Sequence, residues 1–352
     1  MITGSTTKIN QSPMATGTIS SGIALDQKRL IDEALLPVAG ELEGLGPELL
    51  RLLECNTVSG NHILNHVLAG GGKRIRPALY FFASRMVGYG GAHLIPMAAV
   101  CEYVHTASLL HDDVIDSSAI RRGKPTPNSI WGDEAAVLVG DLIYARASEL
   151  MAETGSLQIV SMFARAIRLM SDGELLQLEH LYNPVMSEEV YLKIIEQKTA
   201  VLLAAACKAP AVLAGVSLAD CEALSEFGRC LGFAFQLLDD ALDYAGTESV
   251  FGKKTLSDLP EGKITLPIIL LKSLATPAEW GFVEGLIHEE RVSEASMSRV
   301  LALVETYDTA GKTLEAASNW TDRALVALAH FPNNSARHDL ENLANRLLVR
   351  FS

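Results

Sequence analysis

Two short segments of the chain share the pattern Asp-Asp-x-x-Asp, each at the end of an apolar run. Their aspartates are Asp112, Asp113 and Asp116 in the first segment and Asp239, Asp240 and Asp243 in the second. On a helix, the first and last aspartate of each pattern project from one face, about one turn apart. Clustered carboxylates repel one another unless a cation lies between them, and oxygen ligands without His or Cys favour a hard ion such as Mg²⁺. The pattern therefore predicts a magnesium site that also holds a substrate phosphate.

The simplest alternative for either cluster is a solvated helix face. With 42 acidic residues in a chain of 352, an acid-acid-x-x-acid pattern arises roughly 0.6 times by chance. Two matches built only of aspartate are expected in well below about one chain in a hundred. Because both clusters also end apolar runs instead of alternating with other charges, we favour the metal site.

Ten of the 29 cationic residues gather in four short segments. They are Lys73, Arg74 and Arg76; Arg121, Arg122 and Lys124; Lys198; and Lys253, Lys254 and Lys263. Arginine forks pair with two phosphate oxygens at once, and lysines act as point charges. Arg121 follows Asp116 by only five residues, which brings a cation next to metal-binding anions. Together these groups predict a site for a diphosphate leaving group.

The chain as a whole is acidic, with a formal net charge of −13. Such a chain repels a phosphate backbone, which disfavours general nucleic-acid binding. No stretch reaches the roughly 18 uninterrupted apolar residues of a membrane span. The five cysteines are scattered and none forms a Cys-x-x-Cys pair, so neither a disulfide framework nor a zinc site is predicted. We expect a cytoplasmic protein.

Apolar residues recur mostly at helical spacing from Ile23 onward, while Pro and Gly fall between segments. Three such sets are Ile31, Leu35 and Val38; Leu49, Leu50 and Leu53, after a helix start at Gly46-Pro47; and Leu175, Leu178 and Leu181. Residues 264–271 have the β-branched density of a strand, but Pro267 makes a helix start at least as consistent. We predict an all-α protein with a disordered tail over residues 1–22 and one helical domain over residues 23–352.

Several strings, in order between about residues 26 and 350, resemble the trans-polyprenyl diphosphate synthases, most closely the long-chain octaprenyl type. They are Gly-Gly-Lys-Arg-Ile-Arg-Pro (71–77), His105 before the first aspartate cluster, Arg-Arg-Gly-Lys-Pro-Thr (121–126), Lys-Thr-Ala (198–200), Phe-Gln-Leu-Leu-Asp-Asp (235–240) and Gly-Lys (262–263) before Thr-Leu-Pro (265–267). The resemblance implies the isoprenoid synthase fold, a single antiparallel helical bundle around a deep central cavity, usually as a homodimer. Hydrophobic residues make up 49% of the chain, and some of them would line the cavity walls.

The resemblance also implies roles for individual residues. The diphosphate of isopentenyl diphosphate would be held by Lys73, Arg76, His105 and Arg122. The allylic diphosphate would be surrounded by Arg121, Lys198, Thr199, Gln236, Lys253 and Lys263. Two or three Mg²⁺ ions would be coordinated by Asp112, Asp116, Asp239 and Asp243, and Asp113 and Asp240 would complete the catalytic set. His111 is interpreted as structural.

The implied reaction is a Mg²⁺-dependent, head-to-tail (1′-4) condensation of isopentenyl diphosphate with an allylic diphosphate. Mg²⁺ and the cations stabilise the departing diphosphate, and an allylic carbocation forms in a dry apolar pocket. The isopentenyl double bond attacks this cation, and a proton is lost to the released diphosphate. The reaction needs no side-chain nucleophile, which agrees with the lack of a Ser-His-Asp or Cys-His pattern in the sequence.

Product length depends, in this family, on the residues four and five positions before the first aspartate cluster, where an aromatic side chain stops growth. Here these positions hold Ala107 and Ser108, and the same helix face continues through Val104, Cys101 and Met97, none of them aromatic. We therefore expect a product longer than geranylgeranyl, of the type used for quinone side chains. The alternative is a short-chain synthase that makes farnesyl or geranylgeranyl diphosphate.

The sequence departs from the family pattern after the second aspartate cluster, where Leu256 stands in the segment in which a glycine is common. If that glycine supplies a positive φ, the loop that carries Lys253 is expected to differ in shape. Two other protein classes fit the sequence less well. A di-iron bundle needs two Glu-x-x-His pairs, and the chain has one, Glu102 to His105. A non-catalytic subunit of a heteromeric synthase would lack aspartate clusters that are intact here.

Overall fold

The computed structural model describes residues 29–53, 55–68, 72–121, 123–244, 256–289 and 292–348. The predicted tail at residues 1–22 lies outside these ranges, as do Arg122, Lys253 and Lys254. Within them the regular structure is helical except for one short hairpin, so the all-α prediction is confirmed. None of the helices in these ranges is long and apolar enough to span a membrane.

The elements of the first half of the chain are η1 (Leu36–Val38), α2 (Ala39–Arg51), α3 (Val58–Leu68), α4 (Ile75–Met86), α5 (Leu94–Ile115), β1 (Ile120–Arg121), β2 (Lys124–Pro125), α6 (Pro127–Trp131), α7 (Asp133–Glu153) and α8 (Leu157–Glu179). The second half contains α9 (Glu188–Ile195), the π-helical turn η2 (Glu196–Ala200), α10 (Val201–Ala214), α11 (Leu218–Asp243), α12 (Leu266–Leu274), α13 (Pro277–Ile287), α14 (Glu294–Thr306), α15 (Thr309–Leu328) and α16 (Ser335–Leu348). Strands β1 and β2 pair antiparallel, with Arg121 opposite Lys124.

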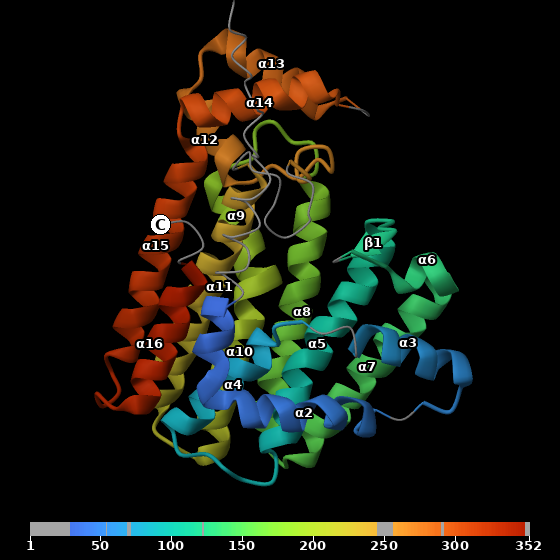
Figure 1. The fold of residues 1–352 in the computed structure, drawn as a ribbon, viewed down its shortest axis with the longest axis vertical. Helices are drawn as coiled ribbons and strands as arrows, with labels where there is room; N and C mark the ends of the chain where they lie inside the picture. The colour runs from blue at the N-terminus through green and yellow to red at the C-terminus, as the bar shows by residue number, and fades with distance from the viewer. Residues whose placement is uncertain are drawn as a thin grey trace, which may run out of the picture.

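The long helices form a bundle whose members run roughly along the long axis of the molecule, while α13 and α14 lie across one end (Figure 1). Helix α11 packs mainly on α15 and α10, and α5 packs mainly on α7. Gly155 (φ +68°) and Gly215 (φ +66°) supply the left-handed residues that reverse the chain between α7 and α8 and between α10 and α11. Neighbouring helices joined by such short turns are antiparallel, as predicted.

Helix α11 is the central element of the core because it crosses both hydrophobic clusters. Its Phe227 and Leu231 belong to a cluster formed largely by the first two thirds of the chain, and its Leu237 belongs to a second cluster with α9 and α12–α15. Glycine permits a close contact between α11 and η2. A Cβ atom on Gly232 would lie 2.5 Å from the Cα of Ala200, so α11 approaches the π-helical turn more closely than any larger residue would permit.

Three sequence-based details have different outcomes. The predicted helix start at Gly46-Pro47 is wrong, since Pro47 lies inside α2. A proline removes one backbone hydrogen bond, and the helix continues because Leu45 and Leu49 on either side of it are buried in the core. The helix start near Pro267 is confirmed, since α12 begins at Leu266. The third set, at Leu175 and Leu178, is mostly solvent-exposed although its spacing is helical.

Candidate active site

The first aspartate cluster occupies the C-terminal turn of α5. Asp112 and Asp113 lie in the helix, and Asp116 is its C-cap residue, with its main-chain N–H donating to the Asp112 carbonyl (2.8 Å). Asp113 is buried, and Nε of Arg121 donates to its Oδ1 at 2.6 Å. Burial raises the pKa of Asp113, and the hydrogen bond from Arg121 opposes that rise. The Asp113 carboxylate therefore fixes the hairpin that carries Arg121, a contact that the sequence analysis did not predict.

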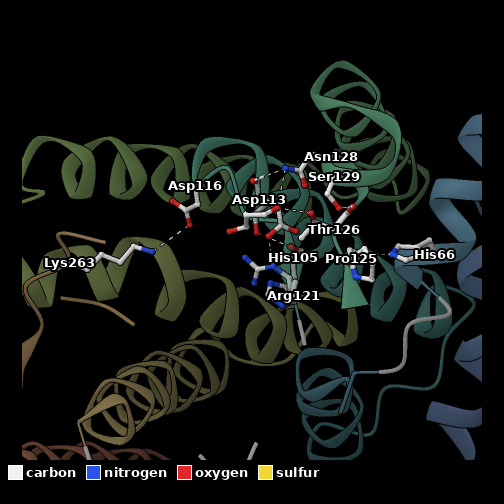
Figure 2. A network of polar contacts seen from close by, with 12 residues as sticks. His66, His105, Asp113, Asp116, Arg121, Pro125, Thr126, Asn128, Ser129 and Lys263 are labelled. Carbon is white, nitrogen blue, oxygen red and sulfur yellow. Dashed lines mark hydrogen bonds and ion pairs between the residues drawn. The ribbon is translucent and has the colours of Figure 1, made fainter. Parts of the chain in front are cut away.

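This hairpin is held against the end of α5 by a network of side chains (Figure 2). Thr126 Oγ1 donates to the carbonyl of Ser118 at 2.6 Å, and Asn128 Nδ2 lies 3.2 Å from the carbonyls of both Asp113 and Ser118. His66 of α3 contacts the opposite side, with its Nε2 2.9 Å from the carbonyl of Pro125. The basic segment after α5 is thus anchored at both ends.

Asp112 is half-buried and has the most perturbed environment of this cluster. Burial is the main reason that its pKa rises to about 6, and the negative charge of Glu174 on α8 adds to the rise. The charges of Lys198 and Arg121 lower the pKa but do not offset these two effects. A carboxylate that is costly to ionise in the empty protein is one that a bound cation stabilises.

The second aspartate cluster occupies the last turn of α11, but its three members have different surroundings. Asp239 is half-buried. Asp240 is buried, where it accepts hydrogen bonds from the hydroxyl of Tyr191 (2.5 Å) and from Nε2 of Gln236 (2.8 Å). Burial raises the pKa of Asp240 to about 7. The Asp240 carboxylate therefore ties α9 to α11 through Tyr191.

Asp243 is engaged by the chain that returns after residues 245–255, which are outside the described ranges. Its Oδ1 accepts hydrogen bonds from the main-chain N and from Oγ of Ser257, both at 2.9 Å, and its Oδ2 accepts one from the N–H of Asp258 at 3.0 Å. Leu256 has φ +61°, in the left-handed region that glycine normally occupies. The loop thus keeps a glycine-like conformation at residue 256 even though the side chain is leucine.

Lys198 and Thr199 are brought to the site by the π-helical turn η2, a local widening that often accompanies functional residues. Lys198 Nζ lies 2.5 Å from Oε2 of Glu174 and 3.0 Å from Oε1 of Gln177, both on α8. Thr199 Oγ1 donates to Oε1 of Gln236 on α11 at 3.0 Å. Two consecutive residues therefore link the α8 side of the site to the helix that carries the second aspartate cluster.

Lys263 contacts the first aspartate cluster from the loop that follows the second cluster. It follows the loop held by Asp243, and its Nζ lies 3.5 Å from Oδ2 of Asp116, as Figure 2 shows, and 2.7 Å from Oε2 of Glu261. Burial lowers the pKa of Lys263, but the hydrogen bond to Glu261 and the charge of Asp116 outweigh it, so the pKa lies above its ordinary value. The ammonium group therefore stays charged beside the first cluster.

The residues predicted to bind isopentenyl diphosphate lie on adjacent elements. Lys73 precedes Arg74, the N-cap residue of α4, Arg76 is in the first turn of α4, and His105 is on α5, against which α4 packs. All three are half-buried, and Arg122, the fourth predicted residue, lies outside the described ranges. His111 contacts α7, with its Nε2 3.2 Å from the carbonyl of Val137, which agrees with a structural role.

The two residues predicted to control product length precede Asp112 on α5. Ala107 is completely buried, and Ser108 is half-buried, with its Oγ donating to the carbonyl of His105 at 2.8 Å. Because that hydroxyl is bonded to its own helix, Ser108 presents a small surface to its neighbours. No aromatic side chain stands at either position.

The ligand chemistry at the ends of α5 and α11 fits Mg²⁺. Asp112, Asp116 and Asp239 offer carboxylate oxygens only, and Mg²⁺ is commonly held by one or two carboxylates together with water and substrate phosphates. Across the residues that the structure describes, no three His, Cys, Asp or Glu side chains are grouped closely enough to hold a metal ion alone. Phosphate oxygens of a substrate would complete the coordination.

Comparison with known proteins agrees with this geometry. Residues 59–304 match the model of the polyprenyl synthetase family. The chain belongs to this family. It is 38% identical to octaprenyl diphosphate synthase of Escherichia coli over 312 residues, which cover 89% of this chain and 96% of that one.

Solved structures of family members have the same fold. A decaprenyl diphosphate synthase from Rhodobacter capsulatus superposes with a TM-score of 0.86 at 36% identity and covers 91% of this chain and 99% of its own. A polyprenyl synthase from Caulobacter crescentus, solved with calcium and isoprenyl diphosphate, also has a TM-score of 0.86, at 41% identity, and covers 90% of this chain and 97% of its own.

Several residues of the site in this family member were not found by sequence reasoning. Glu174 and Gln177 lie one turn apart on α8 and hold Lys198, and Tyr191 and Ser257 hold aspartates of the second cluster. The i, i+3 spacing of Glu174 and Gln177 is the only signal in the sequence, and it is common on solvated helices. Tyr191 and Ser257 carry no local signal, because their partners are distant in the sequence.

Proposed function

We propose that this chain is a long-chain trans-polyprenyl diphosphate synthase. It condenses isopentenyl diphosphate head-to-tail (1′-4) with an allylic diphosphate. The observation that supports this most strongly is the contact between Lys263, beyond the second aspartate cluster, and Asp116 of the first, since it brings two sets of carboxylates and a cation to one end of the bundle. The match to octaprenyl diphosphate synthase along nearly the whole chain supports the same reaction.

The allylic diphosphate binds between the ends of α5 and α11 in this proposal. Arg121, Lys198 and Lys263 supply positive charge, and Thr199 and Gln236 supply hydrogen bonds. Asp112, Asp116 and Asp239 are the proposed ligands of two or three Mg²⁺ ions, which supply charge neutralisation of the diphosphate when they are bound. Lys253 belongs to this group by family resemblance alone.

Isopentenyl diphosphate binds, in this proposal, at the N-terminal end of α4. The residues that bind it are Lys73, Arg76, His105 and Arg122. The arginine forks and the lysine hold the diphosphate, which points the double bond toward the allylic carbon. When the allylic C–O bond breaks, the cations around the leaving diphosphate stabilise its developing charge. The double bond then attacks the allylic cation, and a proton passes to the released diphosphate.

The hydrocarbon grows, we propose, along the face of α5 that leads away from Asp112. Ala107 and Ser108 place no aromatic side chain on this path, and the buried Val104, Cys101 and Met97 that follow on the same face are not aromatic. The alternative product, farnesyl or geranylgeranyl diphosphate, requires a block close to Asp112 that neither position supplies.

Product sizing tests the reaction and the product length together. The protein is incubated with labelled isopentenyl diphosphate, an allylic primer and Mg²⁺, and the products are separated by chain length. We expect products longer than 20 carbons. A 15- or 20-carbon end product in excess isopentenyl diphosphate would contradict the long-chain assignment, and no elongation at all would contradict the reaction.

Asp112→Ala and Asp239→Ala should each abolish turnover while the protein stays folded.

We further propose that the protein is a homodimer that pairs through α7 and α8, which contact each other. Leu138 on α7 is 67% exposed, and Leu175 and Leu178 on α8 are 60% and 40% exposed. Large apolar side chains gathered on neighbouring helices are typical of interfaces. Sedimentation should give a dimer, and Leu175→Glu should give a monomer. The control Val326→Glu, at an exposed position of α15, should leave the dimer intact.

We place the protein in the cytoplasm. All five cysteines are free thiols, and four of them are buried. Free thiols persist in a reducing compartment. Fractionation of cells that express the protein, followed by immunodetection, tests this, and recovery from an oxidising compartment would contradict it.

A further inference from the structure

Asp243 receives four hydrogen bonds from three consecutive residues. Its main-chain carbonyl accepts one from the N–H of Leu256 at 2.7 Å. Its two carboxylate oxygens accept three more, from the N–H and hydroxyl of Ser257 and from the N–H of Asp258. Oδ1 takes two of these and Oδ2 takes one, so most of the acceptor capacity of this carboxylate is already used.

The hydrogen bonds of Asp243 also set the path of the chain that follows. The Asp258 carbonyl accepts a hydrogen bond from the N–H of Lys263 at 2.9 Å, and the Gly262 carbonyl accepts one from the N–H of Tyr182 at 2.8 Å. The side chains of Leu256 and Leu259 are buried. Residues 256–263 are therefore a compact turn with one end fixed on Asp243 and the other carrying Lys263.

The turn 256–263 places Lys263 next to the first aspartate cluster. Lys263 Nζ lies 3.5 Å from Oδ2 of Asp116, on a helix far away in the sequence. A lysine side chain is flexible, so a contact across the site depends on where its main chain is held. Since the turn is fixed on Asp243, that aspartate determines how far Lys263 reaches toward the first cluster.

We propose that Asp243 is a positioning residue that fixes the turn 256–263, and through it Lys263, and that Asp243 is not a ligand of the metal. This rests on the proposed function of the site. It also explains how Leu256 is held in a left-handed conformation that is unfavourable for leucine, because its N–H is bonded to Asp243 and its side chain is buried. The three aspartates of the second cluster then have different roles. Asp239 binds the metal, Asp240 holds α9, and Asp243 holds the turn 256–263.

The first test measures the stability of the turn 256–263 itself and needs neither substrate nor metal. Amide hydrogen exchange of Ser257 and Asp258 is measured in the wild type and in Asp243→Asn, with Asp239→Asn as the matched control one helical turn away. We expect exchange at both amides to be at least about tenfold faster in Asp243→Asn and unchanged in Asp239→Asn. Unchanged exchange in Asp243→Asn would overturn the proposal even if the enzyme proved to have a different activity.

The second test separates positioning from metal binding. The half-saturating Mg²⁺ concentration and the KM for the allylic diphosphate are measured for Asp239→Asn, Asp243→Asn, Lys263→Met and the double variant Asp243→Asn/Lys263→Met. We expect Asp239→Asn to raise the Mg²⁺ requirement. Asp243→Asn should leave that requirement within about twofold and raise the KM about tenfold, as Lys263→Met does. The double variant should be no worse than Lys263→Met alone.

Two outcomes would overturn the positioning role. One is a rise in Mg²⁺ requirement for Asp243→Asn equal to that for Asp239→Asn. The other is an additive loss in the double variant, since residues that act through one another are not additive. If Asp243→Asn fails to fold, Ser257→Ala replaces it, because it removes only the hydroxyl bond to Oδ1 and should raise the KM in the same direction by a smaller factor; an unchanged KM would then contradict the proposal.

Discussion

The Nζ atom of Lys198 lies 2.5 Å from Oε2 of Glu174, and both side chains are largely shielded from water. The pair joins the π-helical turn to α8, and it places a negative charge beside Asp112 and a positive charge where the allylic diphosphate is proposed to bind. Lys198 is therefore held in place before any substrate arrives.

Removing one partner of this pair should cost more than removing both. Lys198→Met leaves the Glu174 carboxylate without its cation, and we expect a loss of about 1–3 kcal/mol in the free energy of unfolding. The double variant Glu174→Gln/Lys198→Met should recover at least about 1 kcal/mol of that loss. Urea unfolding of the metal-free proteins measures both values, and purely additive effects would show that the pair contributes nothing specific.

Asp112 should make the stability of the metal-free protein depend on pH. Its folded pKa of about 6 lies above the ordinary value of 3.8, so the folded state binds the proton more tightly than the unfolded state. Proton binding at Asp112 therefore stabilises the folded state, and this stabilisation is fully present below about pH 4 and is lost as the pH rises through about 6. Asp112→Asn should therefore match the wild type near pH 4 and be about 2 kcal/mol more stable at pH 8. Urea unfolding with EDTA checks this, and parallel pH profiles would contradict it.

Adding a side chain at Gly232 or Gly173 should destabilise the protein. A Cβ atom on Gly232 would lie 2.5 Å from the Cα of Ala200, and one on Gly173 would lie 2.7 Å from the Cβ of Gln197, so either would push on the turn that carries Lys198. We expect each alanine substitution to destabilise the protein by about 1–3 kcal/mol and to lower kcat.

A helical glycine with open space around it is the control for these two substitutions. A Cβ on Gly281, in α13, would meet nothing within 4 Å. Gly281→Ala should stabilise the protein by about 0.5–1 kcal/mol and leave product formation unchanged. Thermal unfolding and product assays of the three variants test this contrast, and equal effects at all three positions would show that close packing is not the cause.

An aromatic side chain at residue 107 should shorten the product. Ala107 is completely buried on the face of α5 that leads away from Asp112, so Ala107→Phe fills the proposed path of the hydrocarbon. We expect a shorter main product in the chromatographic assay. Ser108→Ala, which removes only the hydroxyl bonded to the His105 carbonyl, should leave the length unchanged. An unchanged product in Ala107→Phe would show that the hydrocarbon runs elsewhere.

Residue types and spacing were sufficient to predict the fold class and the family's reaction. Helical periodicity and the positions of glycine and proline predicted an all-α domain because burial of an apolar face follows a regular repeat. The paired aspartate clusters and the gathered cations predicted a diphosphate site because few other chemistries need both at once. The errors in this prediction were local. Pro47 did not start a helix because tertiary packing on both sides outweighs the loss of one hydrogen bond.

The division of labour among the aspartates was decided only by the tertiary structure. The spacing of Asp239, Asp240 and Asp243 does not indicate their partners, yet Asp240 contacts Tyr191 and Asp243 contacts Ser257, and both partners are separated from them in the chain. The role of Glu174 likewise depends on η2 packing against α8 at Gly173. A carboxylate's function is set by which charges and donors surround it, and those neighbours come together only when the helices pack. Sequence alone therefore determined which carboxylates and cations the protein carries and at what spacing, and the packing of α5, α8 and α11 determined which partners surround each of them.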